Sequence, residues 1–433
     1  MADNKNTSIK KPRMVIIGGG FAGLNFVKRI DRTKWEVILI DKNNFHSFPP
    51  LFYQVATSGV DPSSISFPLR RELRSRAKGA LFNMGTVKSI DTTKKQVTTN
   101  LEALDYDQLV IAAGTTNNFY GIPNLEKNVY TLKSTAEAIR CRNDILDRLE
   151  RAAIIEDAET RRKLLTFTII GGGPTGVEVA GALGEMKKYI LKREYPRIEQ
   201  DDVTVNIIEG SDRLLRTMSE KASQEALKYM AHLMVNVTLG KTMSTYEHNI
   251  IRFTDGEEIY SEMVIWTAGI TGEPFTFVGK QPEMGPGNRF IVDEFNRVQG
   301  VDDIFAIGDI CLHMDEKYPR GCPQLAQVAI QQAKNLAYNL NRQKFSHPFV
   351  YKDKGTMATV GRNRAVCDFN HFHMSGLPAW FTWMLVHLMS LLGMRNKIMV
   401  FITWIWSYFT YSSGARLLLH TNRYPLRKRW EEC

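Results

Sequence analysis

The clearest pattern in the chain is a short apolar run that leads directly into a cluster of glycines. Residues 14–17 are apolar and mostly β-branched, as in a buried strand. The glycines of a G-x-G-x-x-G sequence follow: Gly18, Gly20 and Gly23. Residues 24–30 then predict a helix, and residues 35–40 predict the next strand. The order strand, glycine turn, helix, strand indicates a nucleotide-binding α/β unit rather than an ordinary glycine-rich turn.

Each glycine of this turn has its own physical task. Gly18 lets the chain turn sharply, Gly20 lets the backbone approach a pyrophosphate, and Gly23 lets the helix lie close to the strand. The phosphates then meet the amino end of the helix, where backbone N–H groups point outward. Asp41 ends the second strand, 18 residues past Gly23, and is placed to accept hydrogen bonds from ribose hydroxyls.

The segment that follows this unit mixes irregular, helical and extended stretches. Two prolines interrupt residues 42–54, so that stretch is neither helix nor strand throughout. Residues 61–76 predict a polar, basic helix. Short strands are expected after it, at residues 80–82, 86–90 and 96–99. A buried strand within residues 105–115 ends at Ala113 and Gly114, whose small size lets the backbone approach a ligand.

The opening pattern recurs in the middle of the chain. Residues 167–170 repeat the apolar run. Its glycines stand in the same relative positions: Gly171, Gly173 and Gly176. The matching second strand is expected at residues 203–209, after a long helix and connection at residues 185–202. Its terminal acid, Glu209, suits a ribose 2′-hydroxyl and repels a 2′-phosphate, which favours NADH over NADPH despite the nearby Arg213.

Two further segments extend the nucleotide-binding pattern. Residues 263–269 form another strand that ends in small residues. Residues 302–309 form a short strand that ends in Gly-Asp, which is also a common turn pair. Following two nucleotide folds, Asp309 is expected to bond a ribityl hydroxyl of a flavin. Two such folds imply two dinucleotides, for example a tightly held FAD and an exchanging NADH.

Residues 323–333 predict a helix in which Gln327 and Gln331 share one face, because they are four residues apart. Without context, this pair is equally typical of a solvated polar face.

The C-terminal region is apolar, aromatic and basic. Residues 377–394 and 398–415 carry no Lys, Arg, Asp or Glu and hold four of the seven tryptophans. Three interpretations are open: two spanning helices, which need roughly 20 apolar residues each, buried globular helices, or helices that lie in a membrane interface. We favour the third, because aromatic faces with basic flanks are typical of interfacial helices. The positive charge of Arg423 and residues 427–429 indicates acidic lipid.

Bulk composition agrees with this interpretation. A chain of 433 residues predicts two to three domains. A net charge of +10 suggests nucleic acid or an anionic membrane as a partner; we find no nucleic-acid module. The five cysteines form no C-x-x-C pair and no metal-ligand spacing, which fits a reducing compartment, and the first 13 residues show no secretory signal.

Taken in order, these motifs resemble the two-dinucleotide flavoprotein superfamily and, within it, the type II NADH dehydrogenases, which are single-chain NADH:quinone oxidoreductases. More specific to that family are His46 with the sequence LFYQVAT at residues 51–57, and the sequence AQVAIQ at residues 326–331. The family usually has Thr-Gly-Gly where this chain has residues 57–59 as Thr-Ser-Gly. The likeness runs from about residue 13 to the C-terminus.

The resemblance implies an α/β fold with two Rossmann-like dinucleotide-binding domains and a C-terminal membrane-associated helical region. The expected domains are a first FAD-binding part (10–122), an NADH-binding domain (123–285), a second FAD-binding part with the quinone-site helix (286–345) and a membrane anchor (346–433). The expected cofactor-binding residues are Gly18, Gly20, Phe21, Ala22, Gly23, Asp41, Lys42, Val87, Ala113, Gly114, Gly308, Asp309, Gln324, Leu325, Ala326, Gly171, Gly173, Pro174, Thr175, Gly176, Glu209, Ala268 and Gly269.

The resemblance also implies a reaction. NADH passes a hydride to FAD, and two electrons then go to a membrane quinone without proton pumping. Gln327 and Gln331 would line the quinone pocket, and Glu178, near the nicotinamide–flavin contact, would help relay protons. The alternative for Glu178 is an acid in a first helical turn. His46 is expected to be structural, and no metal is expected.

The implied partners are NADH, a membrane quinone and an anionic lipid surface at the cytoplasmic face of the cell membrane, where the protein would be peripheral and monotopic. A homodimer is also compatible with the sequence. Two alternatives remain. One is a sulfide:quinone oxidoreductase, since Cys311 and Cys322 lie near the flavin motif. The other is a membrane-tethered, NADH-binding redox-signalling flavoprotein.

Overall fold

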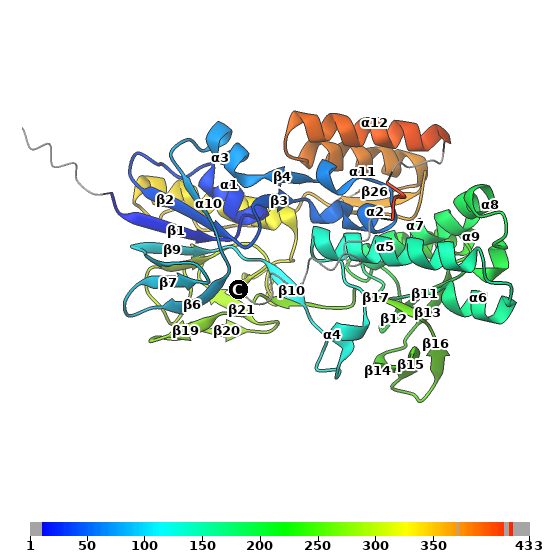
Figure 1. Ribbon diagram of the computed structural model, residues 1–433. Helices are drawn as coiled ribbons and strands as arrows, with labels where there is room; N and C mark the ends of the chain where they lie inside the picture. The colour runs from blue at the N-terminus through cyan, green and yellow to red at the C-terminus, as the bar shows by residue number, and fades with distance from the viewer. Residues whose placement is uncertain (1–10, 370–371, 411–414, 419–433) are drawn as a thin grey trace, which may run out of the picture. The chain divides into compact units, whose positions relative to one another are not determined.

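The computed structural model of the protein describes residues 11–369, 372–410 and 415–418 (Figure 1). Its contacts divide the described chain into two compact units, each assembled from separate stretches of sequence. The first unit comprises residues 11–46, 67–117 and 270–354. The second comprises residues 47–66, 118–269 and the described residues from 355 onward. The domain boundaries expected from the sequence remain predictions.

A five-stranded parallel sheet organises the first unit, in the order β22-β9-β1-β2-β5. Its strands are β1 (Arg13–Ile17), β2 (Glu36–Asp41), β5 (Leu81–Met84), β9 (Gln108–Ile111) and β22 (Ile304–Ala306). Their near-continuous apolar runs are typical of parallel strands that are covered on both faces. The helices of this unit are α1 (Phe21–Val27), α3 (Leu69–Arg76) and α10 (Ala326–Arg342), and α1 packs against α10.

Smaller sheets complete the first unit. One contains β19 (Thr276–Val278), β6 (Val87–Asp91), β7 (Gln96–Thr99) and β8 (Ala103–Asp105). Another contains β20 (Met284–Gly285), β21 (Arg289–Val292) and β23 (Cys311–His313), and β10 (Thr115–Asn117) pairs with β18 (Ile270–Gly272). A single apolar core cluster joins residues of the main sheet, such as Val15 and Ile40, to Ile90 of β6 and Phe290 of β21.

The second unit repeats the parallel arrangement in the order β13-β12-β11-β17. These strands are β11 (Thr166–Ile170), β12 (Thr204–Glu209), β13 (Asn236–Leu239) and β17 (Met263–Trp266). Its longer helices are α5 (Thr135–Ala152), α7 (Pro174–Glu185) and α9 (Glu220–His232). A π-helical turn, η3 (Met186–Ile190), continues α7 into α8 (Leu191–Glu194). The long connection predicted between the glycine turn and β12 is therefore present.

Further elements of the second unit are short or peripheral. They are the antiparallel sheet β14 (Met243–Glu247), β15 (Ile250–Phe253) and β16 (Glu258–Tyr260), the antiparallel sheet β24 (Thr356–Thr359), β25 (Ala365–Phe369) and β26 (Phe372–Ser375), the helices α2 (Phe52–Ala56), α4 (Leu125–Asn128) and α6 (Ala158–Leu164), and the 3-10 turns η1 (Pro49–Leu51), η2 (Pro62–Ser64) and η4 (Gln200–Asp202). The strands β3 (Phe45–Ser47) and β4 (Ser66–Pro68) lie where the chain passes from one unit to the other.

Three predicted helix boundaries were wrong. The helix predicted for residues 61–76 starts only at Leu69, because Pro68 lacks an N–H group and holds the residue before it extended. The helix predicted for residues 24–30 is α1, which begins directly at the glycine turn and ends at Val27. The helix predicted from residue 323 starts at Ala326, after Pro323.

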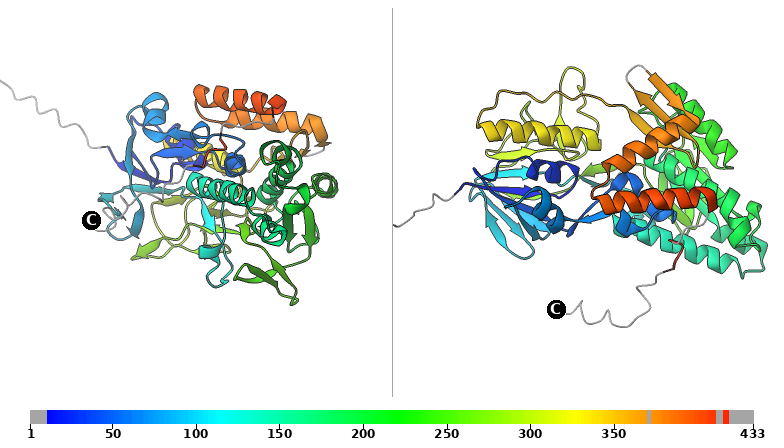
Figure 2. Two further views of the ribbon diagram at one scale, coloured as in Figure 1. Left: turned by 45° about the vertical axis from the view of Figure 1, so that its right-hand side comes forward. Right: turned by 90° about the horizontal axis from the view of Figure 1, so that it is seen from above.

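The two uncharged C-terminal runs form the helices α11 (Gly376–Ser390) and α12 (Met394–Thr410) (Figure 2). The break lies at residues 391–393 rather than at the charged residues that follow, and Arg395 and Lys397 belong to the first turns of α12. Among the described residues, no helix combines the length and the apolar character needed to cross a bilayer. Arg423 and residues 427–429 lie outside the described residues.

Candidate functional site

The first glycine turn is closed by backbone packing and open where a ligand would lie. Gly18 has a φ of +103°, and a Cβ there would lie 2.4 Å from the carbonyl oxygen of Ala112. A Cβ at Gly23 would lie 1.9 Å from the carbonyl oxygen of Gly18. A Cβ at Gly20, which precedes α1, would meet nothing within 4 Å. This cradle at a helix N-terminus fits a pyrophosphate.

The second glycine turn has the same geometry. Gly171 has a φ of +111°, and a Cβ there would lie 2.7 Å from Ala268. A Cβ at Gly176 would lie 1.9 Å from the carbonyl oxygen of Gly171. Open space again surrounds the middle glycine, Gly173, which precedes α7. The pattern repeated in the sequence is thus a repeated backbone shape.

The acid at the end of each second strand reaches back to its turn. Asp41 accepts a hydrogen bond from the amide of Gly19 at 2.6 Å. Glu209 accepts one from the amide of Gly172 at 2.5 Å. Burial raises the pKa of Asp41 despite the hydrogen bonds it accepts. Both carboxylates therefore stand at the edge of a turn, where a ribose beside a bound pyrophosphate would present its hydroxyls.

A buried glutamine fixes the Gly-Asp segment after β22. The amide of Gly308 donates to Oε1 of Gln332 at 2.7 Å, and Gln332 is 1% exposed. The carbonyl of Asp309 accepts from Nε2 of Gln324 at 3.0 Å. Sequence reasoning missed Gln332. It directly follows Gln331, so it lies on a different face of α10 from the two predicted glutamines. It ties the expected flavin-binding loop to that helix.

The other flavin-binding residues expected in the first unit surround these elements. The ring of Phe21 packs edge-on against His46, with centroids 5.3 Å apart. His46 is buried, and its Nδ1 lies 2.9 Å from the carbonyl oxygen of Gly19, which fits the structural role predicted for it. Burial lowers the pKa of His46. The remaining positions are Ala22 in α1, Lys42 after β2, Val87 in β6, Ala113 and Gly114 after β9, and Leu325 and Ala326 at the start of α10.

In the second unit, an aromatic ring covers the end of β17. The hydroxyl of Tyr120 donates to the carbonyl of Ala268 at 3.1 Å. A Cβ at Gly269 would lie 2.6 Å from that hydroxyl, so a larger residue there would displace the ring. Pro174 and Thr175, also expected at the nucleotide, are the first two residues of α7. Sequence reasoning missed Tyr120, which has a φ of +51°.

Gln327 and Gln331 both lie on α10 and bind the same stretch of backbone. Oε1 of Gln327 accepts from the amide of Lys354 at 2.9 Å. Gln331 donates to the carbonyl of Lys352 at 2.9 Å and accepts from its amide at 3.1 Å. Both side chains are half-buried. They bind the backbone of residues 352–354 and therefore do not form a freely solvated face.

Glu178 is a buried carboxyl in the interior of α7. It is 8% exposed, and burial raises its pKa to about 8, against the opposing effects of the Thr359 amide and the Trp383 indole. The Thr359 amide donates to its Oε1 at 3.5 Å. The first turn of α7 contains no acid, so the alternative of a first-turn acid is wrong. A carboxyl whose pKa lies in this range can exchange protons close to neutral pH.

A chain of polar side chains continues from Thr359. Its hydroxyl lies 3.0 Å from the hydroxyl of buried Tyr53, which accepts from Nε2 of Gln54 at 3.0 Å. Oε1 of Gln54 in turn accepts from the indole of Trp404 at 2.8 Å. The sequence LFYQVAT contains the tyrosine and the glutamine, but sequence reasoning gave neither a role, because their partners lie some 300 residues away and more.

Comparisons with known proteins identify the family. The family model of pyridine nucleotide-disulphide oxidoreductases matches residues 12–333, and that of the NDH2 C-terminal domain matches residues 354–411. A type II NADH:quinone oxidoreductase of Mycobacterium tuberculosis is 32% identical over 94% of this chain and 90% of its own length. The chain belongs to the type II NADH:quinone oxidoreductase family.

More distant relatives agree. A mitochondrial internal alternative NAD(P)H-ubiquinone oxidoreductase of Arabidopsis thaliana is 28% identical over 92% of this chain and 84% of its own length. Among solved structures, NDH2 from Plasmodium falciparum in complex with NADH has a TM-score of 0.87 at 21% identity, covering 95% of this chain and all of that one. At that identity the structure supports the fold, which is the predicted α/β fold.

The cysteines of this type II enzyme do not favour the sulfide:quinone alternative. The solved sulfide:quinone oxidoreductase of Aquifex aeolicus shares the fold, with a TM-score of 0.71 at 19% identity, covering 94% of this chain and 96% of that one. Burial raises the pKa of Cys311 to about 12 and that of Cys322 to about 11. Neither thiol therefore ionises readily at neutral pH, and a thiolate is what attacks sulfur substrates. The full-length relatives also give no support to the signalling alternative.

The C-terminal helices of the type II enzyme divide their apolar side chains between two environments. Trp383 and Trp404 are buried. Large apolar side chains of both helices are exposed nevertheless: Phe381, Leu385, Met389, Met394, Ile402, Trp406 and Phe409, the last at 77%. Large apolar side chains that are exposed along two consecutive helices are typical of an interaction site. We call these seven residues the apolar face.

Proposed function

We propose that this protein oxidises NADH and delivers two electrons to a quinone, with FAD as the carrier between them. The observation that carries the proposal is the repeated turn. Gly20 and Gly173 each stand open at the start of a helix, and each turn is bonded to an acid, Asp41 or Glu209. FAD, when bound, accepts a hydride and releases two electrons to a quinone. The protein itself binds the two nucleotides, orients the quinone and supplies protons.

The first unit supplies the residues for FAD. The amides at the start of α1 would bind the pyrophosphate, and Asp41 would accept hydrogen bonds from the ribose. Asp309, whose loop is held by Gln324 and Gln332, would bind the ribityl chain. The second unit supplies the corresponding set for NADH, with Glu209 on the adenosine ribose, where a 2′-phosphate would be repelled.

Glu178 and the α10 glutamines are proposed for the quinone half of the reaction. Reducing a quinone to a quinol consumes two protons. Glu178 can donate one of them at neutral pH, because its raised pKa keeps it protonated there. Gln327 and Gln331 orient the quinone, and their bonds to residues 352–354 hold them in place for it. Protons return to Glu178 from water.

Turnover measurements test the function. The detergent-purified protein with bound FAD should oxidise NADH rapidly when a soluble quinone is present and slowly without it. Flavin absorbance should bleach on adding NADH and return on adding quinone. A colourless protein, or NADH oxidation that is indifferent to quinone, would falsify the proposal.

We further propose that the apolar face seats the protein peripherally on an anionic bilayer, at the cytoplasmic face of the cell membrane. Its exposed aromatic and aliphatic residues, with Arg395 and Lys397 in α12, suit a charged interface. Binding to vesicles should be stronger with acidic lipid and should fall for Phe409→Ser and Trp406→Ser. Equal binding to neutral and acidic vesicles would contradict the anionic preference. Sedimentation in detergent tests whether the protein forms the homodimer that the sequence leaves open, whose protein mass would be twice 49.4 kDa.

A further inference from the structure

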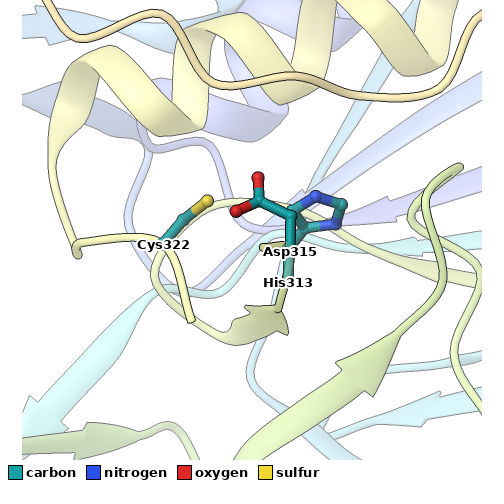
Figure 3. Close-up of side chains that lie close together, drawn as sticks. All are labelled: His313, Asp315 and Cys322. Atoms are coloured by element: carbon teal, nitrogen blue, oxygen red, sulfur yellow. The ribbon is translucent and has the colours of Figure 1, made fainter. Parts of the chain in front are cut away.

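Three side chains of metal-binding type converge beside α10 in the first unit. His313 ends β23, Asp315 follows two residues later, and Cys322 lies just before Pro323 (Figure 3). An imidazole nitrogen, a carboxylate oxygen and the thiol sulfur all lie within 4.8 Å of one another. Nothing in the proposed electron transfer uses them.

His313 lacks the partners that a buried histidine normally has. The residue is 2% exposed, and neither ring nitrogen has a hydrogen-bond partner among the described residues. Leaving a buried polar group without a hydrogen-bond partner destabilises the folded protein. The ring is held by edge-on packing against Phe349, with centroids 5.0 Å apart. A bound ligand would satisfy a nitrogen that the protein leaves bare.

The side chains of Asp315 and Cys322 are positioned by local hydrogen bonds that leave atoms able to bind a metal. The amide of Cys322 donates to the carbonyl of His313 at 2.9 Å, which fixes the thiol beside the ring. Asp315 accepts from the amide of Tyr318 at 2.7 Å through one oxygen. Cys322 packs in an apolar cluster with Val328, Phe349 and Tyr351. An apolar shell of this kind limits water access to a metal and strengthens its bonds.

A largely buried positive charge stands nearby. Arg289 is 9% exposed, and its guanidinium donates to the carbonyls of Cys322 and Arg320, each at 3.4 Å. Those contacts direct its N–H groups to backbone oxygens. Its charge favours the thiolate form of Cys322 and repels a metal dication, so these two effects on metal binding oppose each other.

We propose that His313, Asp315 and Cys322 form a zinc site with a fourth position for water. Nitrogen, oxygen and sulfur together are the ligand set that Zn²⁺ accepts in proteins. Ligands bonded at about 2.0–2.3 Å in a tetrahedron lie closer together than 4.8 Å. The half-exposed Asp315 can make this adjustment by rotating its side chain. Binding releases the thiol proton: Cys322–SH plus Zn²⁺ gives a Zn–thiolate and H⁺.

The site would tie two ends of one loop together. Residues 314–321 connect β23 to Cys322, and α10 with its glutamines starts four residues after that cysteine. Zinc would therefore stabilise the loop that leads into the proposed quinone helix. Binding to the folded state alone raises thermal stability in proportion to the logarithm of metal concentration.

The test uses the full-length, FAD-loaded protein after treatment with a chelator. Titration with Zn²⁺ against a chromophoric chelator should show one tight site per chain, one proton released from the thiol, and a raised Tm. Co²⁺ should produce a thiolate-to-metal charge-transfer band. Asp315→Asn and Cys322→Ser should each weaken Zn²⁺ binding at least about tenfold and remove the Tm increase, and Cys322→Ser should also abolish the Co²⁺ band.

Cys311→Ser is the matched control. Cys311 lies in the same unit and is equally buried, but its thiol contacts Gln332. This variant should keep the tight Zn²⁺ site and the Co²⁺ band. Retained flavin absorbance shows that each variant has folded, and the exposed side of Asp315 makes Asp315→Asn the safer substitution. Zinc binding that is unchanged by Asp315→Asn and Cys322→Ser, or absent from the parent protein, would overturn the proposal.

Discussion

The two nucleotide turns are nearly identical in backbone and differ in what their helices carry. In each, a Cβ on the third glycine would lie 1.9 Å from the carbonyl oxygen of the first. In each, the acid that ends the second strand accepts a hydrogen bond from the amide that follows the first glycine, which is Gly19 or Gly172. Beyond the turn, α1 has seven residues and packs on α10, whereas α7 has twelve and continues through a π-helical turn.

The longer helix has a second use. α7 packs against β24, and a Cβ at Gly181 would lie 2.8 Å from the backbone nitrogen of Gly361. This close approach buries Glu178 and brings Thr359 to it. The backbone geometry of the turn is thus the same in both copies, whereas the helix that follows it differs in length and in the side chains it buries. In the first copy, the helix packs on α10, which holds the loop at Gly308. In the second copy, the helix carries Glu178, the buried carboxyl that we propose as a proton donor.

The most damaging test breaks one turn at a time. Gly23→Ala should yield protein without flavin, because the added Cβ collides with the Gly18 carbonyl. Gly176→Ala should keep its flavin but lose NADH oxidation by about 100-fold, since a displacement of about 1 Å has that effect. Flavin absorbance and stopped-flow reduction by NADH measure the two outcomes. Reduction by dithionite is the control; a Gly176→Ala flavin that NADH reduces at the parent rate contradicts the assignment of the second turn.

The next test removes what α7 has and α1 lacks. Glu178→Gln should slow quinone reduction at neutral pH by about 100-fold while leaving flavin reduction by NADH intact, because general acids contribute at least that factor. The raised pKa of Glu178 predicts the direction of the pH dependence. The rate of quinone reduction by the parent protein should be maximal below about pH 8 and should fall above it, because the carboxyl ionises. The variant should show no such fall. A parent profile that is flat across pH 8 would remove Glu178 from proton delivery.

Sequence reasoning succeeded where the physics is local. Gly18, Gly23 and their second copies are fixed by contacts within a few residues of one turn and one strand end, so the spacing in the chain sufficed. The strands β1, β2, β11 and β12 were also predictable, because buried parallel strands need continuous apolar runs.

It failed where the partner lies far along the chain. Gln332 was overlooked because its acceptor oxygen serves a loop 24 residues earlier. The link from Gln54 to Trp404 spans 350 residues, and no periodicity indicates it. Two of the four C-terminal tryptophans, Trp383 and Trp404, are buried. Composition alone predicts an aromatic region, but it does not indicate which of its rings are buried.

A finer comparison exchanges the acid of the second turn. Glu209→Gln should raise the Michaelis constant for NADH about tenfold, which corresponds to about 1.4 kcal/mol and is typical of losing a hydrogen bond to a charged group. The preference for NADH over NADPH should relax, because the repulsion of a 2′-phosphate disappears. The initial rates of oxidation of the two nucleotides measure this. Arg213→Ala is the control and should leave the preference in place; an unchanged preference in Glu209→Gln removes that residue from the ribose role.

The smallest effect is expected at α10, the helix that packs on α1. Gln331→Ala removes two hydrogen bonds to Lys352 and a side chain proposed to orient the quinone. The Michaelis constant for quinone should rise several-fold, since a neutral hydrogen bond contributes about 1 kcal/mol. Flavin reduction by NADH should be unaffected, as Gln332 still holds the loop at Gly308. Gln332→Ala is the contrasting variant and should weaken flavin retention instead. If Gln331→Ala slows flavin reduction and leaves quinone kinetics alone, the exposed and buried faces of this helix have been assigned the wrong way round.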